Sequence, residues 1–188
     1  MTQVAVSQKY NRTTYMILCA VFAALTAVCA WIAIPLPFTP VPVVLATMAT
    51  LLAGGLLGTK YGTLSMVVYL LLGAVGAPVF AGFKSGLGAL AGPTGGFLIG
   101  YITSAFLCGL LLSKLSKNKL TWGRIFLAAT AGLFSCYVLG TAWFMYSTGT
   151  GFYASMMMCV VPFLPGEVLK TIAAAFLIKK LRPIVYEN

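Results

Sequence analysis

Long apolar runs without charged residues cover most of this chain, and they limit its fold more than any other feature. Stretches such as MVVYLLLGAVGA (66–77) and FLAATAGLF (126–134) contain no charge. Only 7% of the residues are charged, whereas soluble domains carry about 25%. The bilayer core offers no water to the backbone, so membrane proteins are helix bundles or closed barrels. Barrel strands alternate apolar and polar residues, and the continuous runs therefore predict an all-α integral membrane protein.

Six apolar segments are candidates for transmembrane helices, which need about 20 residues each. We predict a single six-helix membrane domain over residues 1–188, with helices at 14–34, 43–57, 61–77, 94–113, 125–146 and 162–179. The second and third segments are short and are separated by a tight Gly-Thr-Lys-Tyr-Gly turn. The first is predicted to be a retained helix, because a signal peptide has a shorter apolar run and a cleavage site.

Positive charge predicts the orientation of the bundle. With a cytoplasmic N-terminus, ten cations fall on the inner side and one, Lys84, falls in an outer loop, while Lys170 lies within the last helix. Cations concentrate on the cytoplasmic side of membrane proteins, so both termini are predicted to be cytoplasmic in a prokaryotic-type, multi-pass cell membrane protein. No soluble basic face remains for nucleic acid. The inner cations are Lys9, Arg12, Lys60, Lys114, Lys117, Lys119, Arg124, Lys179, Lys180 and Arg182.

Most catalytic chemistry lacks its residues in this chain. There is no His and no Asp, and the five cysteines all lie in apolar runs, where they resemble buried apolar side chains. GGLLGTK (54–60) does not have the order of a phosphate-binding loop. The sequence therefore predicts no metal, no cofactor and no ATPase site. An enzyme is disfavoured because general acid–base chemistry would depend on one interior carboxylate.

Three outer connections, at 34–42, 78–93 and 146–154, are rich in Pro, Gly and aromatic residues and hold almost no charge. Exposed loops are normally polar, and non-helical backbone at membrane depth is tolerated where it lines a cavity. We therefore predict that the outer loops form a roof over a binding pocket. The second loop, with six glycines between 78 and 96, is the predicted gate.

Glu167 and Lys170 form the strongest candidate site. The chain has two acidic residues, and Glu167 is the interior one. It follows Pro165-Gly166 at the start of the last helix, where the helix dipole favours an anion, and Lys170 lies on the same helix face. Ionisable residues within membrane segments are functional candidates by default. The alternative is an ion pair that only stabilises the bundle.

Nearby polar and aromatic residues complete the predicted pocket. A carboxylate accepts hydrogen bonds from N–H donors, and an ammonium group donates to oxygen. The predicted ligand is therefore small, largely apolar and ring-containing, with N–H donors and one negative group. The remaining candidate residues are Lys84, Thr39, Phe38, Gly92, Thr94, Trp143, Tyr146 and Tyr153.

IPLPFTPVPVVLATMATLLAGGLLG (34–58), the GPTGG block (92–96) and PFLPGEVLKTIAAA (162–175) closely resemble the BioY family of biotin transporters. The resemblance covers about residues 14–178. It implies the substrate-capture (S) component of an energy-coupling factor (ECF) transporter, which binds biotin and acts with a transmembrane coupling protein and two ATPases. The family's acidic-x-x-Lys motif falls on Glu167 and Lys170. Glu167 is expected to accept a hydrogen bond from the ureido N–H. Lys170 is expected to donate to the ureido oxygen or to the tail carboxylate. Lys84 and the backbone N–H groups of the glycine loop are the competing candidates for the tail carboxylate.

Small residues four apart allow close helix approach in lipid. Glycines at 54, 58 and 62 and at 88, 92, 96 and 100 are predicted to pack helices together. The resemblance places the coupling-protein contact on Ala20 and Ala24, or on the overlapping Ala23 and Ala27. The rival interpretations are an S component for another ring-containing vitamin, a small membrane-embedded enzyme and a structural membrane protein.

Overall fold

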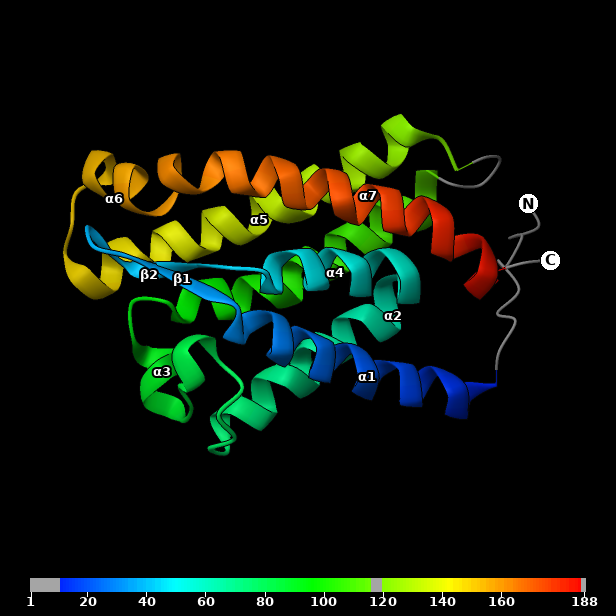
Figure 1. Ribbon diagram of the computed structural model, residues 1–188, viewed down its shortest axis with the longest axis horizontal. Coiled ribbons are helices and arrows are strands. Elements are labelled where there is room, and N and C mark those ends of the chain that lie inside the picture. The colour runs from blue at the N-terminus through cyan, green and yellow to red at the C-terminus, as the bar shows by residue number, and fades with distance from the viewer. Residues whose placement is uncertain (1–10, 116–119, 187–188) are drawn as a thin grey trace.

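The computed structural model describes residues 11–115 and 120–186, and it is a bundle of long helices with a small β-hairpin at one end (Figure 1). Lys9, Lys117 and Lys119 lie outside the described residues. The elements in chain order are α1 (Arg12–Trp31), β1 (Ala33–Leu36), β2 (Thr39–Val44), α2 (Ala46–Ala74), the 3₁₀ turn Ala81–Phe83, α3 (Leu87–Ala91), α4 (Gly95–Leu115), α5 (Trp122–Thr148), α6 (Phe152–Cys159), the 3₁₀ turn Val161–Phe163 and α7 (Leu164–Tyr186).

Helix α2 reverses its direction at Gly58, whose φ of 76° and ψ of −175° are not helical. The Thr50 hydroxyl donates to Met66 Sδ over 3.4 Å. Residues 16 apart in a straight α-helix lie about 24 Å apart, so the two halves of α2 lie side by side. Figure 1 shows the cyan half running to one end of the bundle and the teal half returning. The helices predicted at 43–57 and 61–77 correspond to these halves, which join at one glycine rather than through a longer turn.

The connection predicted as an outer loop at 34–42 forms most of an antiparallel hairpin. Ala33 pairs with Val44, Ile34 with Val43, and Leu36 with Thr39. The hairpin lies beside α6 and the start of α7, at the end of the bundle that also holds α3 (Figure 1). We call this the hairpin end.

The last two predicted helices have different bounds in the structure. Helix α5 continues to Thr148, so Tyr146 is helical rather than part of a loop. The segment from Phe152 to Cys159 is a separate short helix, α6, and α7 begins at Leu164. In residues 11–115 and 120–186, five helices are long and apolar enough to cross a membrane. In this count the bent helix α2 is one helix, and α6 and α7 together are one helix.

Helices α2, α4 and α5 approach closely at glycines. A Cβ added to Gly54 would lie 2.4 Å from the carbonyl oxygen of Ala105, and one added to Gly100 would lie 2.9 Å from Cys136 Sγ. Such distances leave no room for a side chain, which is the expected use of small residues between membrane helices. The predicted packing role is confirmed at these positions. At Gly88, by contrast, an added Cβ meets no atom within 4 Å in residues 11–115 and 120–186.

The described cations at helix ends gather opposite the hairpin end. Lys114 lies in the last turn of α4 and Arg124 in the first turn of α5, while Lys179, Lys180 and Arg182 lie in the second half of α7. In Figure 1 these helix ends lie together with the first turns of α1. The arrangement agrees with the predicted cytoplasmic side, and with that orientation the hairpin end is expected to face outward.

Candidate functional site

A buried cavity lies beneath the hairpin, where α2, α4, α5 and α7 come together with the segment that follows α2. Its free space in this structure is about 70 Å³, whereas ligand pockets typically measure roughly 300–1,000 Å³. Its walls are mostly apolar and aromatic, with few polar groups. The lining residues that matter below are Thr47, Tyr69, Phe80, Lys84, Thr94, Phe97, Tyr101, Tyr137, Phe163 and Glu167.

The first turn of α7 contributes Glu167, as the sequence predicts, and α7 also carries Lys170. Both residues are buried, with 3% and 7% of their surface exposed. Lys170 Nζ donates to Glu167 Oε1 over 2.5 Å, to the Val44 carbonyl over 2.7 Å and to Thr47 Oγ1 over 3.2 Å. An ammonium group has three donors. All three are therefore occupied, and Lys170 is held between α7, the hairpin and α2.

Glu167 has unused hydrogen-bonding capacity. Its Oε1 accepts from Lys170 and from the Thr47 hydroxyl, the latter over 3.2 Å. Its Oε2 is buried and makes no hydrogen bond of normal geometry with the residues that the structure describes, although the Tyr137 hydroxyl lies close to the Glu167 carboxylate and interacts with it. A buried carboxylate oxygen without a donor costs about 1–3 kcal/mol or more. Since Glu167 lines the cavity, an N–H or O–H group of a ligand in the cavity is a suitable partner for it.

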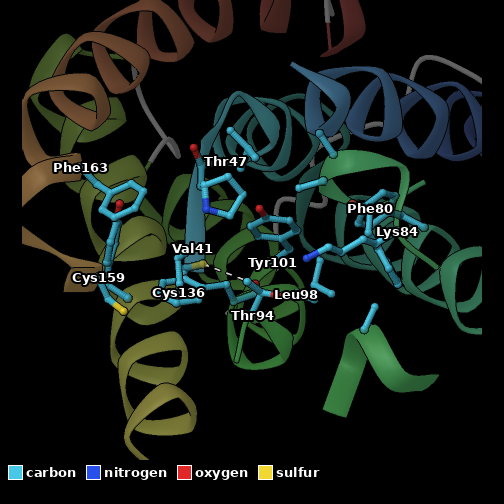
Figure 2. Close-up of a pocket in the computed structure, with 18 of the residues that line it drawn as sticks. Val41, Thr47, Phe80, Lys84, Thr94, Leu98, Tyr101, Cys136, Cys159 and Phe163 are labelled. Atoms are coloured by element: carbon cyan, nitrogen blue, oxygen red, sulfur yellow. Dashed lines mark hydrogen bonds between the residues drawn. The ribbon is translucent and has the colours of Figure 1, made fainter. Parts of the chain in front are cut away.

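Lys84 lies at the other side of the cavity, on the loop that the sequence marks as a gate. Figure 2 shows its side chain reaching from this loop into the group of lining residues. The Phe80 amide donates to the Lys84 carbonyl over 3.1 Å, which closes a turn around Ala81–Phe83. Unlike Lys170, Lys84 is exposed. Thr94, another predicted site residue, also lines the cavity.

Aromatic side chains from the helices form much of the wall. The Tyr69 hydroxyl donates to the Val79 carbonyl over 3.2 Å, and its ring meets Phe80 edge-on at 5.6 Å between centroids. The Tyr101 ring lies 6.3 Å from that of Tyr69. Aromatic rings favour ring-containing ligands, since they offer large apolar faces at fixed positions. Tyr69, Tyr101 and Tyr137 were not predicted as site residues, because they lie within apolar helices and the predicted aromatic residues lie in or next to the outer loops.

Seven predicted pocket residues are not among the described residues that line the cavity: Lys170 and Gly92, and the five that follow. Phe38, Tyr146 and Tyr153 are 55%, 84% and 75% exposed, so their rings lie on the surface. Thr39 is buried, and its hydroxyl accepts from the Val41 amide over 3.2 Å within the hairpin. The Trp143 indole donates to the Gly92 carbonyl over 2.9 Å, which ties α5 to the loop before α4.

Two further hollows adjoin the cavity, one at each side. An apolar groove of about 540 Å³ runs between α5, α6 and α7, and shares Tyr137 and Glu167 with the cavity. A cleft of about 580 Å³ lies beside α3 and shares Lys84, Ala89 and Thr94 with it. Gly92, another predicted site residue, lines the cleft. The cavity is thus bounded by a carboxylate on one side and by an exposed cation on the other.

The overlapping alanine pairs of α1 lie in different environments. Ala23 and Ala27 are buried, with 1% and 6% of their surface exposed, in a cluster that includes Met66. Ala20 and Ala24 are exposed on the outer surface of the helix. A partner protein can reach only exposed residues, so Ala23 and Ala27 serve internal packing. Ala20 and Ala24 are the remaining candidates for the contact with the coupling protein.

A helical membrane bundle with a buried, ring-lined cavity defines this chain as a membrane-embedded solute-binding protein of the transporter class. The BioY family model matches residues 2–187, and the chain belongs to the BioY family. It is 40% identical to the biotin transporter BioY of Thermotoga maritima over 92% of this chain and 98% of that protein. It is 35% identical to the probable biotin transporter BioY of Pyrococcus horikoshii over 88% and 94%.

A solved structure agrees with the family assignment. The S-component for biotin from an ECF-type ABC transporter superposes with a TM-score of 0.84 at 28% identity, covering 94% of this chain and 97% of that one. The relatives are transporters and transporter components rather than enzymes. The resemblance drawn from the motifs around Gly92 and Glu167 is therefore confirmed, and the chain is a multi-pass cell membrane protein.

Proposed function

We propose that this protein is the biotin-binding S component of an ECF transporter and takes up biotin from outside the cell. The observation that carries the proposal is the buried Glu167 carboxylate, which lines a ring-walled cavity and whose Oε2 makes no hydrogen bond of normal geometry among the described residues, with the Tyr137 hydroxyl as its neighbour. Biotin offers two ureido N–H donors on an apolar fused ring, and its tail ends in a carboxylate. The ureido N–H is the partner that Glu167 requires.

The roles of the two α7 residues differ in this proposal. Glu167 contacts the ureido ring directly. Lys170, whose three donors are occupied by Glu167, Val44 and Thr47, acts as a positioning residue that holds the Glu167 side chain in one orientation. This replaces the expectation that Lys170 donates to the ligand. Lys84 is then the cation that faces the tail carboxylate.

Binding requires the cavity to widen, because its free space of about 70 Å³ is small for a ligand of this size. Lys84 belongs to the loop between α2 and α3, in which Gly76, Gly82 and Gly86 have positive φ. Such a loop moves more readily than the helices around it. We propose that this loop, with Lys84, opens to admit biotin.

The partners follow from the family. An S component acts with a transmembrane coupling protein and two ATPases, and Ala20 and Ala24 are the proposed contact with the coupling protein. Replacing Ala24 with Trp should lower biotin uptake in cells that carry the complete transporter at least tenfold, while leaving biotin binding unchanged. The matched control is Leu25→Trp, which is also exposed on α1 but points about 100° away from Ala24 around the helix, and it should retain uptake. Loss of biotin binding in Ala24→Trp would assign Ala24 to internal packing instead.

Isothermal titration calorimetry of the purified protein with biotin tests the proposal directly. We expect tight 1:1 binding, which competing ring-containing vitamins do not displace. Displacement of biotin by another vitamin at comparable concentration would favour an S component for that vitamin. No binding of any vitamin to folded protein would contradict the proposed function.

A further inference from the structure

The cleft beside α3 continues the cavity beyond Lys84. Its lining includes Phe83, Ser85, Gly88 and Gly92, and it shares Lys84 with the cavity. With about 580 Å³ of free space, it is large enough for a small organic group. It lies on the loop and short helix at the hairpin end, which faces outward, so a group held there stays on the outer side of the membrane.

The charges of Glu167 and Lys84 determine the orientation of biotin in the cavity. This orientation rests on the proposed function. Glu167 can only accept hydrogen bonds, so it binds the ureido N–H and repels the tail carboxylate. Lys170 is already neutralised by Glu167 over 2.5 Å. Among the described residues that line the cavity, Lys84 is the remaining cation. The tail therefore ends at Lys84, which lies among the lining residues of the cavity (Figure 2) and also lines the cleft.

We propose that this site also accepts biotin whose carboxyl group is joined through an amide bond to a further group, and that the cleft holds this group. The fused ring and tail of such a conjugate occupy the cavity as those of biotin do. The amide lies beside Lys84, and the attached group extends along Ser85 and Gly88. The substrate class of the site is thus biotin and its amide-linked derivatives.

The apolar groove between α5, α6 and α7 does not serve the same purpose. It meets the cavity at Tyr137 and Glu167, which is the ureido side of the ligand. A tail carboxylate or a polar amide substituent on that side would face the Glu167 charge. The groove also lies among exposed apolar side chains such as Phe134 and Leu164, which suit a lipid-facing surface rather than a polar substituent.

Lys84 should set the preference between the two ligand forms. The free acid pairs with the Lys84 ammonium, whereas an amide is neutral and offers only its carbonyl oxygen. Because Lys84 is exposed, the pair is weak, and exposed pairs change affinity by about two- to fivefold. We therefore expect the amide to bind about two- to fivefold more weakly than biotin, and we expect Lys84→Gln to abolish this difference.

Calorimetry with biotin and Nε-biotinyl-lysine on the intact protein in detergent tests the proposal. Binding of biotinyl-lysine within tenfold of biotin supports it. Binding of biotin together with a loss of more than a hundredfold for biotinyl-lysine overturns it and leaves the proposed function standing. Failure of biotin itself to bind would overturn both.

A variant with a large side chain in the cleft tests whether the cleft holds the attached group. An added Cβ at Gly88 meets no atom of the described residues within 4 Å, and Gly88 lines the cleft, so we expect the side chain of Gly88→Trp to occupy the cleft. We expect it to weaken biotinyl-lysine at least tenfold and to leave biotin within twofold. Ser85→Trp, also in the cleft, provides the same test if Gly88→Trp does not fold.

The matched control fills the groove on the opposite side. Ala142 lines that groove, and Ala142→Trp should leave the affinities for biotin and biotinyl-lysine unchanged. If Ala142→Trp and not Gly88→Trp blocks the conjugate, the tail leaves through the groove and the proposal is wrong. Equal weakening of both ligands by Gly88→Trp would also overturn it, since the cleft would then belong to the biotin site itself.

Discussion

The two lysines beside the cavity carry the same charge in opposite settings. Lys170 is 7% exposed and all three of its donors are occupied by Glu167, Val44 and Thr47. Lys84 is exposed, lies on a glycine-containing loop and points into the cavity (Figure 2). The buried lysine fixes a carboxylate in one orientation, and the exposed one remains free to move as the ligand enters.

The difference between the two lysines indicates that ligand recognition and ligand entry depend on different sides of the same site. A buried ion pair is costly to break, because removing one partner leaves an uncompensated charge. An exposed pair adds little free energy and is screened by salt. In the proposed function, selectivity for the ureido ring is therefore expected to depend on Glu167 on α7, and Lys84 is expected to attract the carboxylate and to move as the loop opens. Substitutions at Glu167 or Lys170 and substitutions at Lys84 should therefore differ in how much they change biotin affinity and in how strongly the change depends on salt.

The largest effect is expected for Lys170→Met, which removes the partner of a buried carboxylate. Loss of one member of a buried ion pair destabilises proteins by about 3–5 kcal/mol. Thermal unfolding in detergent should show a clear drop in melting temperature together with loss of biotin binding. The exposed Lys180 on the same helix gives the matched control, because Lys180→Met should leave the melting temperature near that of the wild type.

Glu167→Gln keeps the shape of the side chain and removes its charge. The amide oxygen is a weaker acceptor than a carboxylate oxygen, so biotin affinity should fall at least tenfold, or about 1.4 kcal/mol. Calorimetry on variant protein that unfolds in a cooperative transition measures this. An unchanged dissociation constant in folded protein would show that the ureido ring binds elsewhere.

Lys84→Gln should have the smallest effect on biotin. We expect a two- to fivefold weaker affinity, as for exposed pairs, and a lower association rate at low salt. Stopped-flow binding at about 20 mM and 500 mM salt measures this, since screening at the higher concentration removes most of the difference. A loss as large as that of Glu167→Gln would contradict the division between the two sides.

The helical framework was predictable because apolar runs and turns are local features. The break between two helical segments near Gly58 follows from the glycines around it. The hairpin at 33–44 was not predicted, since Pro35, Pro40 and Pro42 argue against strands. Both strands of a two-stranded ribbon are edge strands, however, and proline is tolerated at an edge.

The candidate site was predictable only in part. Glu167 stood out because an interior carboxylate is rare in such a chain, whereas Tyr69, Tyr101 and Tyr137 lie in apolar helices where aromatic residues are ordinary. Only the packing of α2, α4 and α5 brings these tyrosines to one cavity. The assignment of Phe38 and Tyr146 to the pocket did not anticipate their exposure, because a position near the outer end of the bundle does not determine the direction of a side chain.

The central claim is that Glu167, held by Lys170, binds the ligand, and the double variant Glu167→Leu with Lys170→Met tests it most directly. Replacing a buried ion pair with apolar residues of similar volume is often neutral or stabilising, so this variant should fold with a melting temperature at or above that of the wild type. Biotin titrated into it by calorimetry should bind at least tenfold more weakly, about 1.4 kcal/mol. A folded double variant with the wild-type affinity for biotin would contradict the account.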